Sequence, residues 1–158
     1  KDQQGNDVRL KDLLKKNRVV LVFYQGEWSP YCNKYLQKLE DSLQLIKDKG
    51  AIVVAVTPEQ PESIAKTIEK TKAEYLILHD TELKIMKGYE VEFEVSENAL
   101  KRYRNGGIKL DEVNGKNGNF LPVPATYIID KEGYITYRFF NQDNKKRPSV
   151  KEILANLK

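Results

Sequence analysis

Apolar residues along the chain form short runs that alternate with segments of helical periodicity. The longest run lies within residues 18–25 and has polar residues on both sides, which is typical of a central strand covered on both faces. After it, Ser29 is a suitable N-cap and Pro30 suits the first position of a helix that ends at Gly50. Apolar residues at steps of three and four predict the buried face of this helix: Leu36, Leu39, Leu43 and Ile46.

The same alternation continues through two further strands. Residues 51–56 form a second apolar run, which Thr57-Pro58 ends, and residues 75–78 form a third. Between them, residues 62–71 have helical periodicity. The inward side chains of that helix are predicted to be Ile64, Ala65 and Ile68. Strands separated by helices of this length predict right-handed, parallel crossover connections.

Residues 96–121 depart from this rhythm. They contain a short helical patch at 99–104 and then turn-forming residues. Those turns contain the pairs Asn105-Gly106, Asn114-Gly115 and Asn117-Gly118. Turn chemistry of this kind indicates an insertion or a long loop inside a domain rather than a linker between domains.

Regular structure returns towards the C-terminus. Residues 125–129 and 134–140 are predicted to be antiparallel strands joined by a turn at 130–133. Ser149-x-x-Glu152 is a capping-box pattern that begins a last helix. Its apolar face is Val150, Ile153, Leu154 and Leu157. The pattern therefore predicts an α/β fold in one domain over residues 1–158, with a central mixed sheet flanked by helices and an insertion before the last two strands.

Composition and charge narrow the class of protein. The chain has 158 residues, of which 40% are hydrophobic and 32% are charged, as in soluble globular domains. No apolar run approaches the ~20 residues that cross a bilayer, so we expect no membrane span. Lys+Arg 27 and Asp+Glu 23 give a net charge of +4, but acids and bases alternate, which predicts a solvated surface and no nucleic-acid partner.

The chain begins at Lys1 without Met, so we expect that an upstream part was removed. The sequence therefore does not distinguish a cytoplasmic from an exported protein.

Cysteine and histidine usage limits the possible chemistry. A single Cys excludes an internal disulfide and a multi-Cys zinc site, and a single His argues against a His-based metal cluster. No pattern for a flavin, nucleotide or haem is present, so we expect neither a metal nor a cofactor. We assign a structural role to His79, at the end of a predicted strand. The run Lys145-Lys146-Arg147 is interpreted as a solvated loop.

Cys32 is the first candidate for chemistry. Counted from the Ser29 cap, it is the third residue of the predicted helix and lies in its first turn. There the free backbone N–H groups and the positive end of the helix dipole stabilise a thiolate, the nucleophilic form. The alternative interpretation is a small buried hydrophobic residue, and the position alone leaves both open.

The neighbours of Cys32 also have structural and functional interpretations. Ser29 caps the helix, and its hydroxyl is within reach of a sulfur three residues later. Trp28 and Tyr31 are either core residues or a wall that limits solvent around the sulfur. A second segment, Pro122-Val123-Pro124, precedes a strand. Either of its X–Pro bonds could be cis, and the simpler interpretation is a rigid lead into the strand.

The resemblance to a known family rests first on one segment, Phe23-Tyr24-Gln25-Gly26-Glu27-Trp28-Ser29-Pro30-Tyr31-Cys32-Asn33. It resembles the active-site segment of the thioredoxin superfamily, above all the peroxiredoxin-like branch, the alkyl hydroperoxide reductase/thiol-specific antioxidant family. Relatives there carry Trp-Cys-Pro-Tyr-Cys-Asn. The likeness continues in order from Gly5-Asn6-Asp7-Val8 through residues 122–130 to Gly133-Tyr134-Ile135. The resemblance implies a thioredoxin-like fold, with Cys32 at the peroxidatic position.

One departure from the family pattern is Ser29, which stands where two-cysteine relatives have their first Cys. An intramolecular Cys-x-x-Cys disulfide therefore cannot form. The spacing Ser29-Pro30-Tyr31-Cys32 matches the Ser-x-x-Cys of peroxiredoxins instead, although Gln25 replaces the Pro of that motif. Whether Ser29 is natural or replaces a Cys is left open.

The second departure is Pro124, which stands where peroxiredoxins have an Arg that holds the thiolate. It resembles the cis-proline of thioredoxins. In that family the backbone of the preceding residue, here Val123, pairs with a thiol substrate. The resemblance thus predicts a cis Val123–Pro124 bond facing Cys32. Candidates to replace the Arg are Arg138, Arg102 and Arg104.

Three functions remain open from the sequence. The first is a thiol-dependent peroxidase: Cys32 attacks a peroxide, becomes a sulfenic acid, and is reduced by an external thiol or a partner protein. In this reaction Ser29 assists Cys32. The residues expected to contact substrate are Trp28, Tyr31, Val123 and Pro124. The second is thiol–disulfide exchange with a protein or small-molecule thiol, which gains weight if Ser29 replaces a native Cys. The third is a redox-inert thioredoxin-fold binding module.

Overall fold

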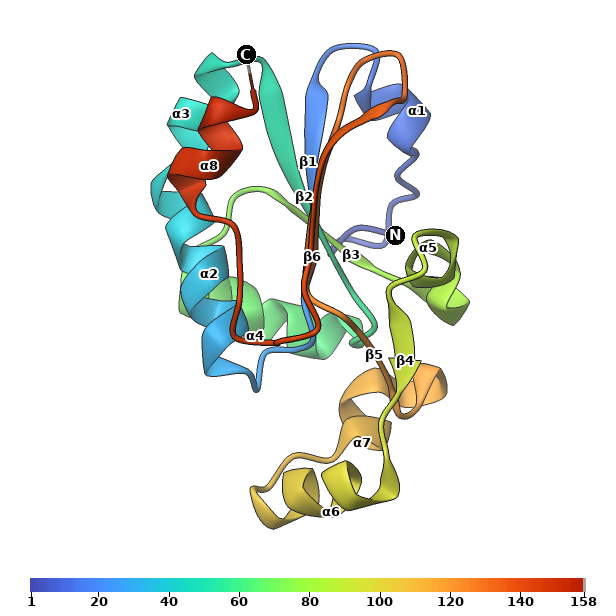
Figure 1. The fold of residues 1–158 in the computed structure, drawn as a ribbon. Helices are drawn as coiled ribbons and strands as arrows, with labels where there is room; N and C mark the ends of the chain where they lie inside the picture. The colour runs from blue at the N-terminus through green and yellow to red at the C-terminus, as the bar shows by residue number, and fades with distance from the viewer. Residues whose placement is uncertain (158) are drawn as a thin grey trace.

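The computed structural model describes residues 1–157, and a five-stranded sheet runs through its centre with the order β3-β2-β1-β6-β7 (Figure 1). The strands are β1 (Arg18–Phe23), β2 (Ala51–Thr57), β3 (Leu76–His79), β6 (Ala125–Ile129) and β7 (Ile135–Phe140). β1, β2 and β3 are parallel, whereas β6 is antiparallel to both β1 and β7. The predicted central mixed sheet and the parallel crossovers are confirmed.

Both faces of the sheet are covered. Four helices pack on one face: α2 (Pro30–Asp41), α3 (Leu43–Asp48), α4 (Pro61–Thr71) and α8 (Val150–Ala155). The other face carries α1 (Leu10–Leu13), the 3₁₀ turn η1 (Thr81–Leu83) and α5 (Lys84–Gly88). An apolar cluster lies on each face of the sheet. Successive residues of β1 contribute to one cluster and then the other, because strand side chains alternate between faces. This explains why β1 has an uninterrupted apolar sequence.

Two details of the helices differ from the sequence predictions. The single helix predicted after β1 is divided at Ser42, whose φ of −108° and ψ of 9° separate α2 from α3. All four residues of the predicted apolar face are nonetheless buried. The inward position of Ala65 is wrong, because it is exposed and the buried face of α4 consists of Ser63, Ile64, Thr67 and Thr71. Two threonines therefore lie on the buried face at positions that the apolar pattern did not include.

The insertion forms a small structure of its own below the sheet (Figure 1). It contains β4 (Glu92–Glu94), α6 (Glu97–Asn105), α7 (Leu110–Asn114), the 3₁₀ turn η2 (Gly115–Asn117) and β5 (Phe120–Pro122). β4 and β5 pair antiparallel, which the sequence did not predict, whereas α6 confirms the predicted helical patch. An apolar cluster holds the insertion together and includes Trp28 from the segment between β1 and α2.

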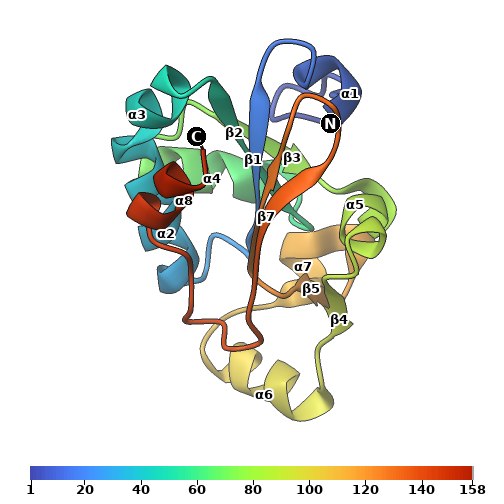
Figure 2. The ribbon, with the colours of Figure 1, turned by 45° about the horizontal axis from the view of Figure 1, so that its top comes forward.

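The C-terminal segment brings the chain back to α2. The β6–β7 hairpin and the helix start at Ser149 are confirmed, and the Ser149 hydroxyl accepts the Glu152 N–H at 3.0 Å. Residues 141–149 cross from the end of β7 to α8, which lies beside α2 (Figure 2). Within residues 1–157, the molecule has no helix of the length and apolar character that a membrane span requires.

We expect Leu39→Ala to lower the free energy of unfolding by about 2–5 kcal/mol, because Leu39 is fully buried between α2 and the sheet and its removal leaves a cavity. Leu45→Ala is the matched control, since that side chain on α3 is 55% exposed and should change stability by less than about 0.5 kcal/mol. Urea unfolding followed by circular dichroism measures both. Equal losses in the two variants would contradict this packing of α2.

Candidate active site

Cys32 lies where the central strand passes into a helix. β1 ends at Phe23, a short segment follows, and α2 begins at Pro30 with Ser29 as its N-cap. The Ser29 hydroxyl oxygen accepts the backbone N–H of Cys32 at 3.3 Å. The predicted cap is therefore present, and it places Cys32 in the first turn of α2.

The Cys32 sulfur is almost fully enclosed and receives two N–H donors. The side chain is only 1% exposed. The backbone N–H of Gln25 donates to Sγ at 3.4 Å, and Nη2 of Arg147 donates to Sγ at 3.4 Å. The sulfur thus has two hydrogen-bond donors, one of them on a positively charged guanidinium. The Cys32 side chain also belongs to the apolar cluster between the sheet and α2, so the alternative interpretation as a buried residue holds for its packing, and the two donors come in addition to that packing.

The interpretation of residues 145–147 as a solvated loop holds for Lys145 and Lys146, which are exposed, and is wrong for Arg147. Arg147 is partly buried, and its Nη1 donates to the carbonyl oxygens of Asn144 and Lys146 at 2.6 and 2.9 Å. Its guanidinium carbon also lies 5.8 Å from the ring centroid of Tyr35. These contacts direct the side chain inward, and no local sequence pattern marks them because Cys32 is 115 residues away along the chain.

The three arginines considered from the sequence lie elsewhere. Arg138 stacks over Phe140 on β7, with its guanidinium carbon 5.0 Å from the ring centroid. Arg102 and Arg104 are exposed on α6. Within residues 1–157, Arg147 is the arginine that contacts the sulfur.

The expectation for Val123–Pro124 is wrong in two respects. Every peptide bond within residues 1–157 is trans, so the predicted cis-proline is absent from the described chain. The Val123 backbone N–H donates to the Val91 carbonyl at 2.7 Å, because the β4–β5 pairing continues past Pro122. That donor is therefore engaged within the chain and is not free for a substrate strand. The segment does approach the site through Pro122, whose carbonyl oxygen accepts Nε2 of Gln25 at 3.2 Å.

Trp28 and Tyr31 have different environments. Trp28 is partly buried against Tyr103 of α6, with ring centroids 5.2 Å apart, so the insertion supports one wall of the site. Sequence reasoning missed Tyr103 because nothing local links α6 to Trp28. Tyr31 is 47% exposed, which contradicts the interpretation as a core residue. The Lys145 ammonium lies 5.9 Å from its ring centroid.

A buried carboxyl group lies on the other side of the same loop. Glu59 is 0% exposed, and its Oε1 accepts the backbone N–H of Glu27 at 2.9 Å. Its Oε2 is buried and has no hydrogen-bond partner within residues 1–157. Burial raises the pKa of Glu59 to about 8, although the Glu27 N–H and the charges of Lys66 and Lys70 act in the opposite direction. No sequence pattern marks this carboxyl group beyond its place after β2.

Space around the Glu59 carboxyl is tight. A Cβ at Gly26 would collide with the Trp28 indole and would lie 2.8 Å from Oε2 of Glu59. Glycine is therefore required at position 26. His79 anchors the backbone here, since its Nδ1 donates to the Glu59 carbonyl oxygen at 2.7 Å. His79 thus has the structural contact that was assigned to it.

The fold and the site together define a thioredoxin-like protein with one cysteine at the start of a helix. The model of the AhpC/TSA family matches residues 1–138, and the chain belongs to this family. Peroxiredoxin Bcp of Bacillus subtilis is 28% identical over 158 residues, which is 100% of this chain and 88% of that protein. The chloroplastic peroxiredoxin Q of Gentiana triflora is 28% identical over 142 residues, covering 90% of this chain and 55% of that protein.

Solved structures agree with the fold. The crystal structure of peroxidoxin BcpB from Mycobacterium tuberculosis superposes with a TM-score of 0.74 at 22% identity, covering 99% of this chain and 88% of that one. The predicted thioredoxin-like architecture and the predicted peroxiredoxin-like class of thiol oxidoreductase are confirmed.

We expect the stability of the protein to fall as the pH rises from the ordinary Glu pKa of 4.5 towards about 8. Between these values the folded state holds the Glu59 proton and the unfolded state has released it, so higher pH favours unfolding. Glu59→Gln keeps an acceptor for the Glu27 N–H but cannot ionise. It should remove this decline and raise the free energy of unfolding near pH 8 by roughly 2–4 kcal/mol relative to the parent.

Urea unfolding at several pH values between about 5 and 8.5 measures this effect. Glu62→Gln is the control, because Glu62 is exposed on the same helix α4. The control should keep the pH dependence of the parent. A decline that persists in Glu59→Gln would show that another group causes it.

Proposed function

We propose that this chain reduces peroxides through Cys32, with an external thiol as the reductant. The observation that carries the proposal is the pair of N–H donors on a cysteine sulfur in the first turn of α2, one from Gln25 and one from Arg147. Membership of the AhpC/TSA family and similarity to proteins named peroxiredoxins support the same activity.

In the first step, the Cys32 thiolate attacks one oxygen of the peroxide. A sulfur–oxygen bond forms, the O–O bond breaks, and the leaving oxygen takes a proton to become water or an alcohol. Cys32 becomes a sulfenic acid. Arg147 and the Gln25 N–H lie where negative charge moves from sulfur to oxygen, so they are suited to stabilise that charge.

Besides capping α2, the Ser29 hydroxyl can donate a hydrogen bond. Its oxygen already accepts the Cys32 N–H, which leaves the hydroxyl hydrogen able to donate to a peroxide oxygen near the sulfur. Trp28, the residue before Ser29, packs against Tyr103 of the insertion. We assign Cys32, Arg147 and Ser29 to the reaction and Trp28 to the exclusion of water.

The second half of the cycle needs a partner, because Cys32 is the single cysteine of the chain. A thiol attacks the sulfenic sulfur, forms a mixed disulfide and releases water. A second thiol then restores Cys32 and leaves as the oxidised disulfide.

The alternative of thiol–disulfide exchange oriented by Val123-Pro124 is less well supported. It relied on a cis Val123–Pro124 bond and on a free Val123 N–H. The bond is trans, and the Val123 N–H donates to the Val91 carbonyl. A redox-inert binding module is also less well supported, since it gives no reason for Arg147 to contact a buried sulfur.

We expect hydrogen peroxide to convert Cys32 to a sulfenic acid that a dimedone probe labels, and Cys32→Ser to abolish labelling. Arg147→Gln should slow the oxidation by roughly 10- to 100-fold, the loss of a hydrogen bond to a charged partner. Arg104→Gln is the control, because Arg104 is exposed on α6 and should leave the rate unchanged. Mass spectrometry at timed intervals gives the rates. A Cys32 that alkylates but never forms a sulfenic acid would refute the proposed activity.

A cysteine at position 29 tests the geometry of the turn. We expect Ser29→Cys to form an intramolecular disulfide with Cys32 on mild oxidation, because residues three apart across a helix N-terminus commonly meet the separation that a disulfide requires. Intact mass should fall by two hydrogens, and Ser29→Ala should show no such loss. Intermolecular dimers without the internal bond would contradict this arrangement.

A further inference from the structure

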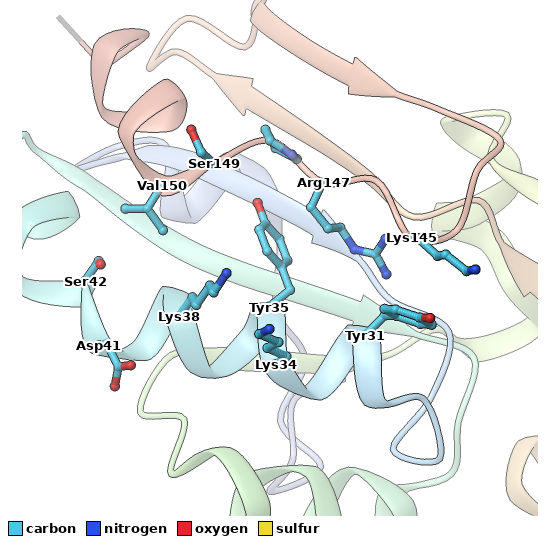
Figure 3. Close-up of a pocket in the computed structure, with 11 residues that line it drawn as sticks. Tyr31, Lys34, Tyr35, Lys38, Asp41, Ser42, Lys145, Arg147, Ser149 and Val150 are labelled. Carbon is cyan, nitrogen blue, oxygen red and sulfur yellow. The ribbon is translucent and has the colours of Figure 1, made fainter.

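A groove of about 610 Å³ lies between α2 and the segment that leads into α8. Figure 3 shows Lys34 and Lys38 on the α2 side and Lys145 and Arg147 on the opposite side. The floor between them is Tyr35. None of the steps proposed above for the reaction with peroxide uses the lysines.

The groove has a strong positive charge. Four cationic side chains line it and Asp41 is the single carboxylate in the lining. Within residues 1–157, none of the four is paired with a carboxylate. Like charges gathered in a concave surface raise the local concentration of anions. The chemistry of the groove therefore suits a ligand with more than one negative group.

Arg147 joins this groove to the reactive sulfur. It lines the groove and at the same time donates to Sγ of Cys32. Cys32 itself is 1% exposed, so a ligand in the groove meets Arg147 before the sulfur. An anionic group that draws the guanidinium towards the groove would remove one of the two donors from Sγ and open the sulfur to a second reactant.

We propose that the groove binds the reducing thiol, and that this thiol is a small molecule carrying carboxylates. The inference rests on the proposed peroxidase function and specifies its reductant. The volume is in the range of small-molecule sites, about 300–1,000 Å³, and the ring of Tyr31, which is 47% exposed, gives the groove an apolar surface for the body of a short peptide. A protein surface is the less favoured occupant, because the cations lie within a recess between two elements.

The bound thiol reduces the Cys32 sulfenic acid in two steps. The bound thiol loses its proton, its sulfur attacks the Cys32 sulfenic sulfur, and an S–S bond forms as the S–O bond breaks. The departing hydroxide takes the proton and leaves as water. A second molecule of the same thiol attacks the outer sulfur of the mixed disulfide, which frees Cys32 and releases the oxidised disulfide.

The first experiment measures binding without any redox step. S-methylglutathione, an anionic tripeptide that cannot react, is titrated into the reduced protein and followed by NMR. We expect shifts concentrated at residues 31–42 and 145–150, and a several-fold weaker affinity in Lys34→Gln/Lys38→Gln. The matched control is Lys47→Gln/Lys101→Gln, which removes the same charge from exposed positions outside the groove. Shifts absent from the groove, or equal affinity in both double variants, would overturn the proposal.

The second experiment measures reduction of Cys32 after oxidation with peroxide. Glutathione should reduce the sulfenic acid faster than the cationic thiol cysteamine, and Lys34→Gln/Lys38→Gln should slow glutathione by about fivefold while cysteamine is not slowed. If the sulfenic acid forms but glutathione and cysteamine reduce it at equal rates, the peroxidase function remains supported and the groove assignment is refuted. Charge-dependent reduction by an acidic protein thiol alone would assign the groove to a protein and also refute it. If no sulfenic acid forms, the binding experiment still decides the groove.

Discussion

An enclosed sulfur that carries out chemistry needs polar partners, because burial without them disfavours its charged form. In this chain the partners come from opposite ends of the sequence. The Gln25 N–H belongs to the segment after β1, and Arg147 belongs to the segment before α8. The return of the C-terminal segment to α2 is therefore a requirement of the site as well as of the core. The Ser149 cap of α8 lies two residues after Arg147.

The loop between β1 and α2 is held from its other side by a different set of contacts. Glu59 accepts the N–H of Glu27, Trp28 packs on Tyr103 of the insertion, and Gly26 leaves room for both side chains. A carboxyl group buried in this way favours its protonated form at neutral pH, since burial raises its pKa to about 8. The loop offers the Gln25 N–H to the sulfur and, two residues further along, the Glu27 N–H to the titratable carboxyl of Glu59.

Charge is distributed unevenly around the site. On the α2 side, four cations line a recess that contains one carboxylate, and Arg147 extends from it to the sulfur (Figure 3). The net charge of +4 on the whole chain conceals this asymmetry. In the assignment that we propose, the groove concentrates anions beside the cysteine and so brings the reductant to a thiol that has no internal partner.

Local patterns were sufficient for the five strands of the central sheet, for the Ser29 and Ser149 caps and for the place of Cys32 in the first turn of α2. Alternation, periodicity and capping depend on neighbours within a few residues. The family resemblance also followed from contiguous motifs. Contacts between distant segments were decided by the tertiary structure alone. It brought Arg147 to the sulfur across 115 residues, and it engaged Val123 with Val91 in a small sheet that no pattern announced. It also kept the Val123–Pro124 bond trans. Such contacts arise from how elements pack, and packing partners leave no periodic trace in a single sequence.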